Sequence, residues 1–444
     1  MASTYLTRSV STTGNRRTWT FSAWVKRSNT TQQYQNMFAA GSNNIRINFS
    51  NQNIWVYDYN GSGFDFYLVT NRLFRDTSAW YHIVVAVDTT QATSSDRVKL
   101  YINGVQETSF STETYPSQNH DTEANTSGEN NVIGTDAGSL GSNSFDGIMS
   151  HVHWIDGTAY DASAFGETDA NGVWTLKTSP SVTYGTNGFF ILKDSASVTD
   201  QSGNGNNFTV GGGTLTDTLD CPANVFATLN PLMHSDNGQT LSNGNLTATI
   251  STGYRVTNTS TLGASVGKYY AECKIGAIGT NGVVIGYINL DKEVFQNISG
   301  TDYFPGDQAY SIGWYGTSGS VFKSQSTVLS LNTYTTGDIL QFAMDLDNGY
   351  FYFGKNGTWE NSGVPTSGSS GTGGYALSNF GTSGDFFTFA SSTQQNAITN
   401  YNFGNGYFGT TAVASAGTNA SGIGIFEYDV PTGYTALSTK GLNL

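Results

Sequence analysis

Short runs of alternating apolar and polar residues recur along almost the whole chain, and they constrain its fold more than any other feature. Alternation with a period of two places successive side chains on opposite faces of a β-strand. The runs are separated by Gly, Asn, Asp and Ser, which favour turns, and the chain contains 53 glycines but only 7 prolines. No stretch repeats apolar residues at the three- and four-residue spacing of an amphipathic helix. The sequence therefore predicts an all-β protein.

The expected strands form two series. The first series comprises residues 18–27, 44–50, 54–60, 64–70, 80–88, 98–103 and 148–155. The second comprises residues 246–250, 268–275, 283–288, 309–315, 339–345, 349–354, 386–390 and 397–403. Hairpin turns are expected at Asn60–Gly63, Asn103–Gly104, Asp347–Gly349 and Asn356–Gly357, because Asn-Gly and related pairs favour tight turns. Two tandem antiparallel β-sandwiches explain both series most simply.

An irregular stretch around residue 215, with a glycine triplet and two prolines, marks the boundary between them. We therefore expect a first domain over residues 1–215, a linker over 216–239 and a second domain over 240–410. Residues 411–444 are expected to pack on the second domain. Residues 112–131 and 363–374 are expected to be surface loops, where binding surfaces are often found.

Composition argues against several classes of partner. The chain has 444 residues, and 33 acidic against 19 basic residues give a net charge of -14. Its only close basic pairs are Arg16-Arg17 and Lys26-Arg27, so we expect no nucleic-acid partner and no attraction to anionic membranes. No window approaches the ~20 apolar residues of a membrane span, and the N-terminus lacks the pattern of a secretory signal. We expect no membrane insertion and synthesis in the cytosol.

Several segments of the first series together resemble a known fold. They are FSAWVKR (21–27), WYHIVVAVD (80–88), VKLYINGV (98–105) and FDGIMSHVHWIDG (145–157). In this order they resemble the laminin-G-like, concanavalin A-type lectin/glucanase sandwich. The later segments FGETDANGVW (165–174), YGTNGFFI (184–191) and DQSGNGNNFTV (200–210) resemble a family of bacteriophage virion proteins.

The second series resembles a SPRY domain. The resemblance rests on GKYYAECKI (267–275), VVIGYIN (283–289), YSIGWYG (310–316), the long segment 337–359 and ITNYNFG (398–404). The tail segment FEYDVPTGYTAL (426–437) is similar to the end of the same phage proteins. The resemblances imply a jelly-roll or concanavalin A-like sandwich followed by a SPRY-like one, in a virion protein such as a tail fibre or receptor-binding component. They also imply other virion proteins and a host surface polysaccharide as partners, and a homotrimer by analogy with fibres.

Aromatic residues carry the strongest signal for a ligand, because sugar rings stack on Trp and Tyr. Trp55, Tyr57 and Tyr59 fall on one face of a single expected strand; they line a glycan groove or belong to the core. In the second domain Trp314 and Tyr315 point to opposite faces. Loops at one rim form the binding surface of SPRY domains, which makes Tyr303, Phe304 and Tyr315 the glycan-binding candidates there.

We expect the protein to require no cofactor, and two groups of residues are candidates for binding a metal ion. The laminin-G resemblance implies calcium at a loop edge, for which Asp121, Glu123, Glu129 and Asp136 are candidates; the alternative is a solvated acidic loop. His151 and His153 lie two residues apart on an expected strand, so both imidazoles reach one face and are candidates for a metal. The alternative is a half-exposed strand without metal.

The sequence favours recognition over catalysis. A retaining glucanase needs two carboxylates close together, usually on one strand with the pattern E-x-D-x-x-E or E-x-D-x-E. The nearest pairs, Glu167 with Asp169 and Glu427 with Asp429, gain no third carboxylate. We expect a non-enzymatic phage particle protein that binds a host glycan. A capsid decoration or structural subunit that binds other virion proteins is the alternative, and a polysaccharide depolymerase is a weaker one.

Overall fold

The structure is a computed structural model, and it describes residues 4–41, 44–235, 238–251, 253, 255–293 and 303–444. The chain divides into two compact units. The first contains Met1–Asp217 and Cys221–Ala223, and the second contains Thr218–Asp220 and Asn224–Leu444. Both units consist mainly of antiparallel strands arranged in sheets, so the prediction of an all-β protein with two tandem sandwiches is confirmed.

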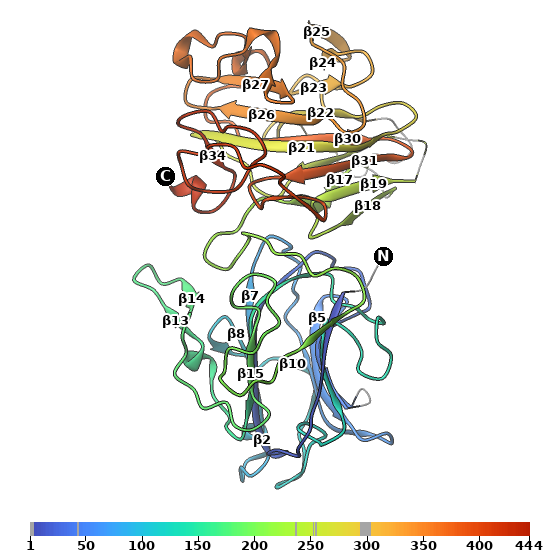
Figure 1. Cartoon of the computed structure of the whole chain (residues 1–444), viewed down its shortest axis with the longest axis vertical. Coiled ribbons are helices and arrows are strands. Elements are labelled where there is room, and N and C mark those ends of the chain that lie inside the picture. Colours follow the sequence, from blue (N-terminus) through green and yellow to red (C-terminus); the bar gives the residue numbers. More distant parts are fainter. Residues whose placement is uncertain (1–3, 42–43, 236–237, 252, 254, 294–302) are drawn as a thin grey trace. The chain divides into compact units, whose positions relative to one another are not determined.

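Two sheets face each other in the first unit (Figure 1). The eight-stranded sheet has the order β10 (Phe110–Thr114), β6 (Phe64–Thr70), β5 (Asn53–Tyr59), β4 (Ile45–Ser50), β3 (Tyr34–Ala40), β11 (Asn130–Ile133), β1 (Tyr5–Ser9), β16 (Thr209–Gly211). The six-stranded sheet has the order β15 (Phe189–Ile191), β12 (Gly147–Asp156), β2 (Thr18–Arg27), β7 (Tyr81–Asp88), β8 (Val98–Ile102), β9 (Val105–Gln106). A separate hairpin pairs β13 (Gly166–Thr168) with β14 (Trp174–Leu176).

The core of the first unit lies between these sheets. Alternate residues of β2 and β7 from one sheet, and of β4, β5 and β6 from the other, supply buried apolar side chains to one cluster. Phe21 and Val85 face Ile47 and Val56 across this layer, and all four are fully buried. Burial of one such side chain contributes about 1.5–3 kcal/mol. The core therefore fixes which residues of β4–β6 point outward.

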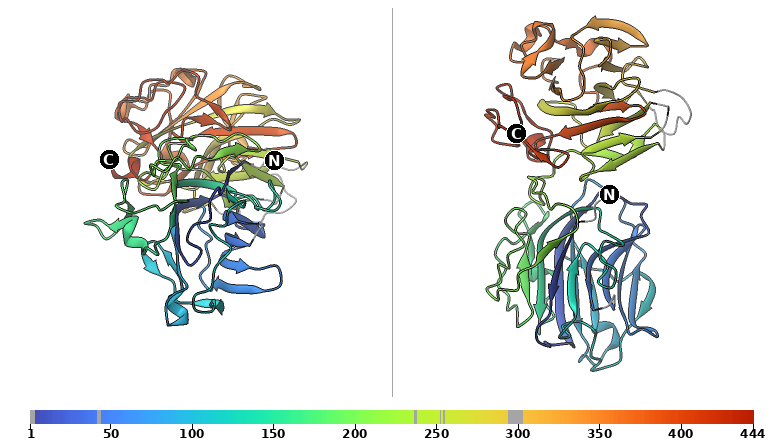
Figure 2. Two further views of the ribbon diagram at one scale, coloured as in Figure 1. Left: turned by 60° about the horizontal axis from the view of Figure 1, so that its bottom comes forward. Right: turned by 45° about the vertical axis from the view of Figure 1, so that its right-hand side comes forward.

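The second unit is also a sandwich, seen from other directions in Figure 2. Its first sheet has the order β17 (Leu229–His234), β20 (Val256–Ser260), β30 (Phe387–Thr393), β22 (Val284–Asn289), β23 (Ser311–Tyr315), β24 (Ser320–Lys323), β25 (Ser326–Ser330). Its second has the order β18 (Gln239–Ser242), β19 (Thr247–Ile250), β31 (Ala397–Asn402), β21 (Lys268–Ile278), β26 (Ile339–Asp345), β27 (Tyr350–Lys355), β28 (Thr358–Trp359). Two short strands extend it: β29 (Tyr375–Ala376) pairs with β27, and β34 (Thr435–Ala436) runs parallel to β21. A hairpin pairs β32 (Tyr407–Phe408) with β33 (Thr411–Ala412).

The C-terminal segment covers one face of this second sheet. Phe426, Val430 and Tyr434 pack with Tyr270 in a cluster of their own. The buried carboxylate of Glu272 accepts hydrogen bonds from the backbone N–H groups of Glu427 and Tyr428, each at 2.9 Å, and from the Tyr270 hydroxyl at 2.9 Å. Burial raises the pKa of Glu272 to about 7. The segment is thus attached to β21 by both apolar and polar contacts.

Most expected strands and turns are found. The expected strand over residues 18–27 is β2, and the one over 339–345 is β26. At the expected turn of residues 103–104, Asn103 and Gly104 both have positive φ, 48° and 83°, as a type I′ turn requires. Strands β3 and β17 lie in stretches where none was expected. The helices of the described residues are short 3₁₀ turns: Ser94–Asp96, Ala162–Ala164, Glu360–Ser362, Gly368–Ser370, Leu377–Asn379 and Gly441–Asn443. None of them has the length and apolar character that a membrane span needs.

Candidate functional site

The outward face of β3–β6 in the eight-stranded sheet combines aromatic and polar side chains. Ile54 and Val56 of β5 belong to the core, so Trp55, Tyr57 and Tyr59 point outward. All three are partly exposed, which resolves the choice between core and surface in favour of the surface. We call this surface, over strands β3–β6, the outer face.

Aromatic rings contact one another along the outer face. Tyr67 lies opposite Tyr57 in the neighbouring strand, and their ring centroids are 5.9 Å apart. Trp55 contacts Tyr67 at 5.4 Å and Tyr34 at 5.7 Å, both in edge-on geometry. Phe64 is 47% exposed and stacks on Tyr67 at 4.5 Å. The rings form one connected, partly exposed aromatic surface.

Polar side chains from β3 and β4 continue the same face. Asn48 lies opposite Trp55 on one side and opposite Asn36 on the other, so the three side chains share a row across the strands. Arg46 lies opposite Tyr57 in the next row, with its guanidinium carbon 5.9 Å from the ring centroid. Partial burial of Tyr57 raises the pKa of its hydroxyl to about 12, so this hydroxyl stays protonated at neutral pH.

Three of these polar atoms are buried without a hydrogen-bond partner among the described residues. They are Oδ1 of Asn36, Oδ1 of Asn48 and Nε of Arg46. Both asparagines are fully buried. Each such unpaired group costs about 1–3 kcal/mol unless a water or a ligand supplies its partner.

The expected calcium ligand Asp136 lies at the border of this face. Its carboxylate accepts a short hydrogen bond from the Asn36 amide and one of 2.7 Å from the Asn143 amide, and it forms an ion pair of 3.2 Å with Arg46. Its charge is therefore neutralised by side-chain donors. Sequence reasoning missed Asn36 because β3 was not expected, whereas the alternation of Arg46 and Asn48 with Ile45 and Ile47 indicated the outward position of both.

The other expected calcium ligands do not gather either. Asp121 forms an ion pair of 2.7 Å with Arg17, which lowers the pKa of Asp121, and Glu123 pairs with Arg16 at 3.2 Å. Glu129 is linked through its backbone carbonyl to Val10. Among the described residues, the side chains that group as three close metal-ligating atoms are Asp58, Asp65 and His120.

His151 and His153 lie on one side of β12, but both rings are buried against Phe190, with centroid distances of 5.6 and 3.9 Å. A register shift between Ser150 and His153, with φ of 50° at His151, interrupts the strand there. Burial lowers the pKa of His151 to about 4 and that of His153 well below its usual value. Within the described chain no carboxylate or thiol completes a group of three ligands around them.

In the second unit the structure separates the three rim candidates. Trp314 is buried and Tyr315 partly exposed, as expected from their opposite faces. Tyr315 and Phe304 both lie near the guanidinium of Arg255, at 4.9 and 5.7 Å, and Phe322 contacts each ring. Tyr303, in contrast, is only 2% exposed, and its hydroxyl donates a short hydrogen bond to Glu293. This burial contradicts the placement of Tyr303 on a binding rim.

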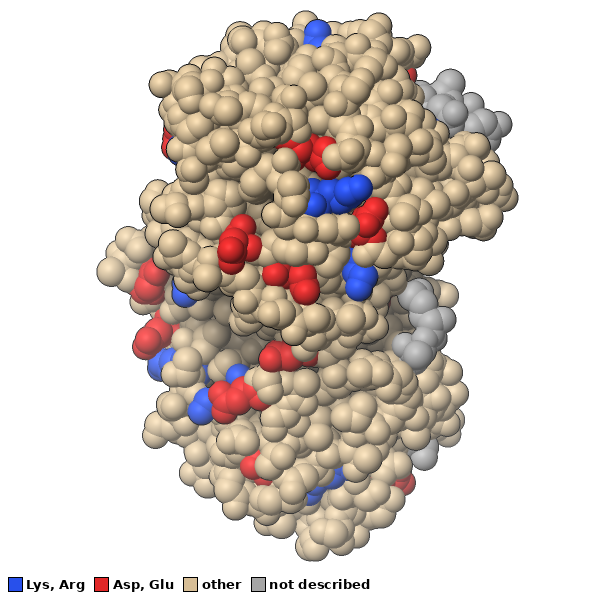
Figure 3. All heavy atoms as spheres, turned by 45° about the horizontal axis from the view of Figure 1, so that its top comes forward, with Lys and Arg blue, Asp and Glu red and all other residues tan. Residues whose placement is uncertain are grey.

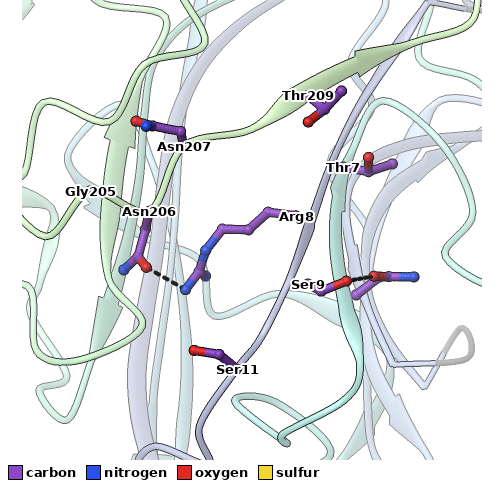
Figure 4. Close-up of a pocket in the computed structure, with 9 residues that line it drawn as sticks. Thr7, Arg8, Ser9, Ser11, Gly205, Asn206, Asn207 and Thr209 are labelled. Carbon is purple, nitrogen blue, oxygen red and sulfur yellow. Dashed lines mark hydrogen bonds between the residues drawn. The ribbon is translucent and has the colours of Figure 1, made fainter.

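A polar pocket of about 410 Å³ lies elsewhere on the first unit, around Arg8 (Figure 4). Its polar groups bind one another: Arg8 donates to Oδ1 of Asn206 at 2.6 Å and to the carbonyl of Asn187 at 3.2 Å, and Ser9 donates to Asn130 at 2.7 Å. Its lining contains no aromatic ring. The pocket lies between β1 and the loop before β16, and it has no aromatic ring on which a sugar could stack.

Charged groups do not form a large patch on the face drawn in Figure 3, where acidic and basic side chains are scattered among uncharged residues. This distribution agrees with the low share of charged residues, 12% of the chain. It gives no basic surface for a nucleic acid on that face.

Comparison with known proteins supports part of the expected resemblance. Residues 2–163 match the Concanavalin A-like lectin/glucanases superfamily. Similar solved structures include the SPRY domain of human HERC1, with 15% identity over 39% of this chain and 96% of that chain and a TM-score of 0.28. They also include a human SPRY domain, with 13% identity over 37% of this chain and 94% of that chain and a TM-score of 0.29. The TRIM65 PSpry domain is 12% identical over 39% of this chain and 89% of that chain, with a TM-score of 0.29. No curated protein matches the chain. None of the proteins named here is a phage protein.

Proposed function

We propose that the protein is a glycan-binding protein and that the outer face of its first unit is the binding surface. The observation that carries this proposal is the juxtaposition of partly exposed Trp55 and Tyr57 with the unpartnered buried amide oxygens of Asn36 and Asn48. A pyranose ring presents C–H groups that stack on aromatic rings and hydroxyls that donate and accept hydrogen bonds. The outer face offers both kinds of partner in adjacent rows.

The unpartnered polar atoms add to the evidence from the rings. An aromatic cluster on a sheet contributes to stability by itself, through contacts between neighbouring strands. Buried amide oxygens without a donor lower stability, and sites that break a local rule in this way are often functional. All three atoms are shielded from solvent, so a sugar pairs with Asn36, Asn48 or Arg46 only after the partly exposed rings beside them move aside. Sugar hydroxyls would then supply the missing donors for the two asparagines, and a sugar oxygen would accept from Nε of Arg46.

We infer binding without hydrolysis. A retaining glycosidase requires two carboxyl groups about 5–5.5 Å apart, one as nucleophile and one as acid. The carboxylate at the border of the outer face, Asp136, is already engaged by Asn36, Arg46 and Asn143. Incubation with a bound polysaccharide should therefore release no new reducing ends, and their release would instead establish a depolymerase.

The biological setting we propose follows from the resemblance of the sequence to phage virion proteins. In that setting the protein is a tail-fibre or receptor-binding component that attaches a particle to a host surface polysaccharide. Several copies, for example in a homotrimer, would convert weak binding at each site into strong attachment. In the alternative, a capsid decoration protein, the sandwiches bind other virion proteins.

The proposal is tested with purified full-length protein on an array of bacterial and other glycans. We expect saturable binding to a glycan class, and loss of that binding in Tyr57→Ala. Tyr315→Ala is the matched control, because Tyr315 is also a partly exposed strand tyrosine but belongs to the second unit. Binding that Tyr315→Ala abolishes and Tyr57→Ala preserves would transfer the site to the cluster of Phe304, Tyr315 and Phe322. Absence of binding to any glycan would favour the structural alternative.

A further inference from the structure

A loop, a strand end and a β-bulge meet at one end of the first sandwich. Asp58 is near the end of β5, on the core side, and it is fully buried. Asp65 follows the hairpin turn, where the pairing of β5 with β6 shifts register between Asp58 and Tyr59. His120 comes from the loop between β10 and β11, and a hydrogen bond from the Thr89 hydroxyl to its carbonyl, 2.7 Å long, fixes that part of the loop. Bulges commonly redirect a side chain in this way.

The three side chains present one ligand atom each at close range. Nε2 of His120 lies 3.4 Å from Oδ2 of Asp58 and 3.6 Å from Oδ2 of Asp65, and all three atoms lie within 4.8 Å of one another. In a tetrahedral zinc site with bonds of about 2.0–2.1 Å, two ligand atoms are separated by roughly 3.3–3.4 Å. Small movements would therefore bring the group to the geometry of a zinc site.

The carboxylate of Asp58 is only partly satisfied: its Oδ2 accepts from the backbone N–H of Glu123 at 3.3 Å and lies 3.4 Å from Nε2 of His120. The carboxylate of Asp65 accepts from the Asn60 amide at 3.0 and 3.1 Å. No lysine or arginine among the described residues forms an ion pair with Asp58 or Asp65, since the nearby Arg16 and Arg17 pair with Glu123 and Asp121. Oδ1 of Asp58 is buried and has no hydrogen-bond partner in the described structure. A buried carboxylate with an unused oxygen, beside a second carboxylate and an imidazole, is suited to a cation.

We propose that Asp58, Asp65 and His120 bind one zinc ion. Imidazole nitrogen together with carboxylate oxygen favours zinc, whereas calcium prefers six to eight oxygen ligands at longer distances. Asp65 and His120 are 24% and 21% exposed, so water can reach the metal and complete its coordination. The ion would join the loop of His120 to the hairpin that carries Tyr59 and Phe64. This site differs from the outer face, because Asp58 points to the core side of the sheet.

The test is zinc titration of the full-length protein after removal of any polyhistidine tag, by calorimetry and by metal analysis after dialysis. We expect one zinc per chain, and a loss of affinity of at least about tenfold in His120→Ala and in Asp65→Asn. Glu123→Gln is the matched control: it removes a neighbouring negative charge but no ligand, and its zinc affinity should stay within about twofold of wild type. Cobalt(II) in place of zinc should give the visible absorption of a four-coordinate site, which His120→Ala abolishes.

Three results would overturn the proposal. They are no zinc binding by the folded wild-type protein, zinc binding that His120→Ala leaves intact, and a preference for calcium over zinc at equal concentration. Circular dichroism shows whether each variant is folded. If His120→Ala is not folded, Asp65→Asn tests the proposal in its place. A failure of glycan binding by itself leaves this result unaffected, because zinc is measured directly.

Discussion

Replacing Asn48 by leucine should weaken glycan binding while leaving stability unchanged or improved. Asn48 is fully buried, its Oδ1 has no partner among the described residues, and its amide donates to the carbonyl of Phe49 at 3.2 Å. An unpaired buried polar group costs about 1–3 kcal/mol, and leucine removes that cost in a side chain of similar shape. We expect the free energy of unfolding to stay equal or to rise by about 1 kcal/mol, since the larger side chain offsets part of the gain.

The same substitution removes the acceptor for a sugar hydroxyl. Without its partner the hydroxyl is left unpaired against an apolar side chain, which costs about 1–3 kcal/mol of binding free energy and weakens binding by roughly 5- to 150-fold. Titration calorimetry with the best glycan from the array measures the loss. Urea denaturation followed by tryptophan fluorescence measures the change in stability.

Asn258→Leu is the matched control. Asn258 is also a fully buried strand asparagine, but its Oδ1 accepts from the backbone of Asn230 at 2.9 Å and its amide donates to the carbonyl of Asn230 at 2.8 Å. Losing both bonds should lower stability by about 2 kcal/mol and leave glycan binding unchanged. If Asn48→Leu behaved like this control, destabilised and still able to bind, Asn48 would be a structural residue and the reasoning would be refuted.

Three further predictions follow from individual contacts. Trp55→Ala should weaken glycan binding, measured by calorimetry, by roughly 10- to 30-fold. A sugar that covers about 50 Å² of the indole and buries a similar area of its own surface gains about 2 kcal/mol of binding free energy. An unchanged affinity would exclude Trp55 from the site. Burial raises the pKa of Glu272 to about 7, so the folded state binds the proton of this carboxyl more tightly than the unfolded state does. The contribution of Glu272 to the free energy of unfolding therefore falls by up to about 3 kcal/mol as pH rises from about 4.5 to about 7. Denaturation across this range should show that Glu272→Gln removes this component, and equal pH profiles would contradict it. Gly104→Ala should lower stability by about 1–3 kcal/mol in the same assay, since φ is 83° and the added Cβ would lie 2.5 Å from the Trp174 ring; a stable variant would show that the turn adapts.

The sequence predicted much of the fold because alternation and turn residues act locally. Runs such as residues 18–27 and 339–345 alternate clearly and end at turns, so strand and hairpin positions agree with the structure. Strand β3 was not expected, since its pairing with β4 includes a register shift between Asn36 and Phe38 that breaks the alternation. Leu229–His234 was assigned to a linker because its residues, including a proline, give little strand periodicity.

The binding face was only partly predictable. The period of two placed Trp55, Tyr57 and Tyr59 together, but whether that side faced the core depended on β4 and β6, which pair with β5. Tyr303 was expected in an exposed loop, and its burial depends on Glu293, a contact across ten positions that no periodicity encodes. His120 and Asp58 lie close together in the fold but 62 positions apart in the sequence, so a local sequence pattern cannot reveal their contact.

The most direct test of glycan recognition by the outer face is the indole N–H region of a two-dimensional ¹⁵N–¹H spectrum recorded with and without glycan. The resonance of Trp55 is identified by its disappearance in Trp55→Phe. We predict that the glycan shifts this resonance and leaves that of Trp314, which is buried in the second unit, unchanged. A glycan that binds while the Trp55 resonance stays in place would contradict the assignment of the site to the outer face.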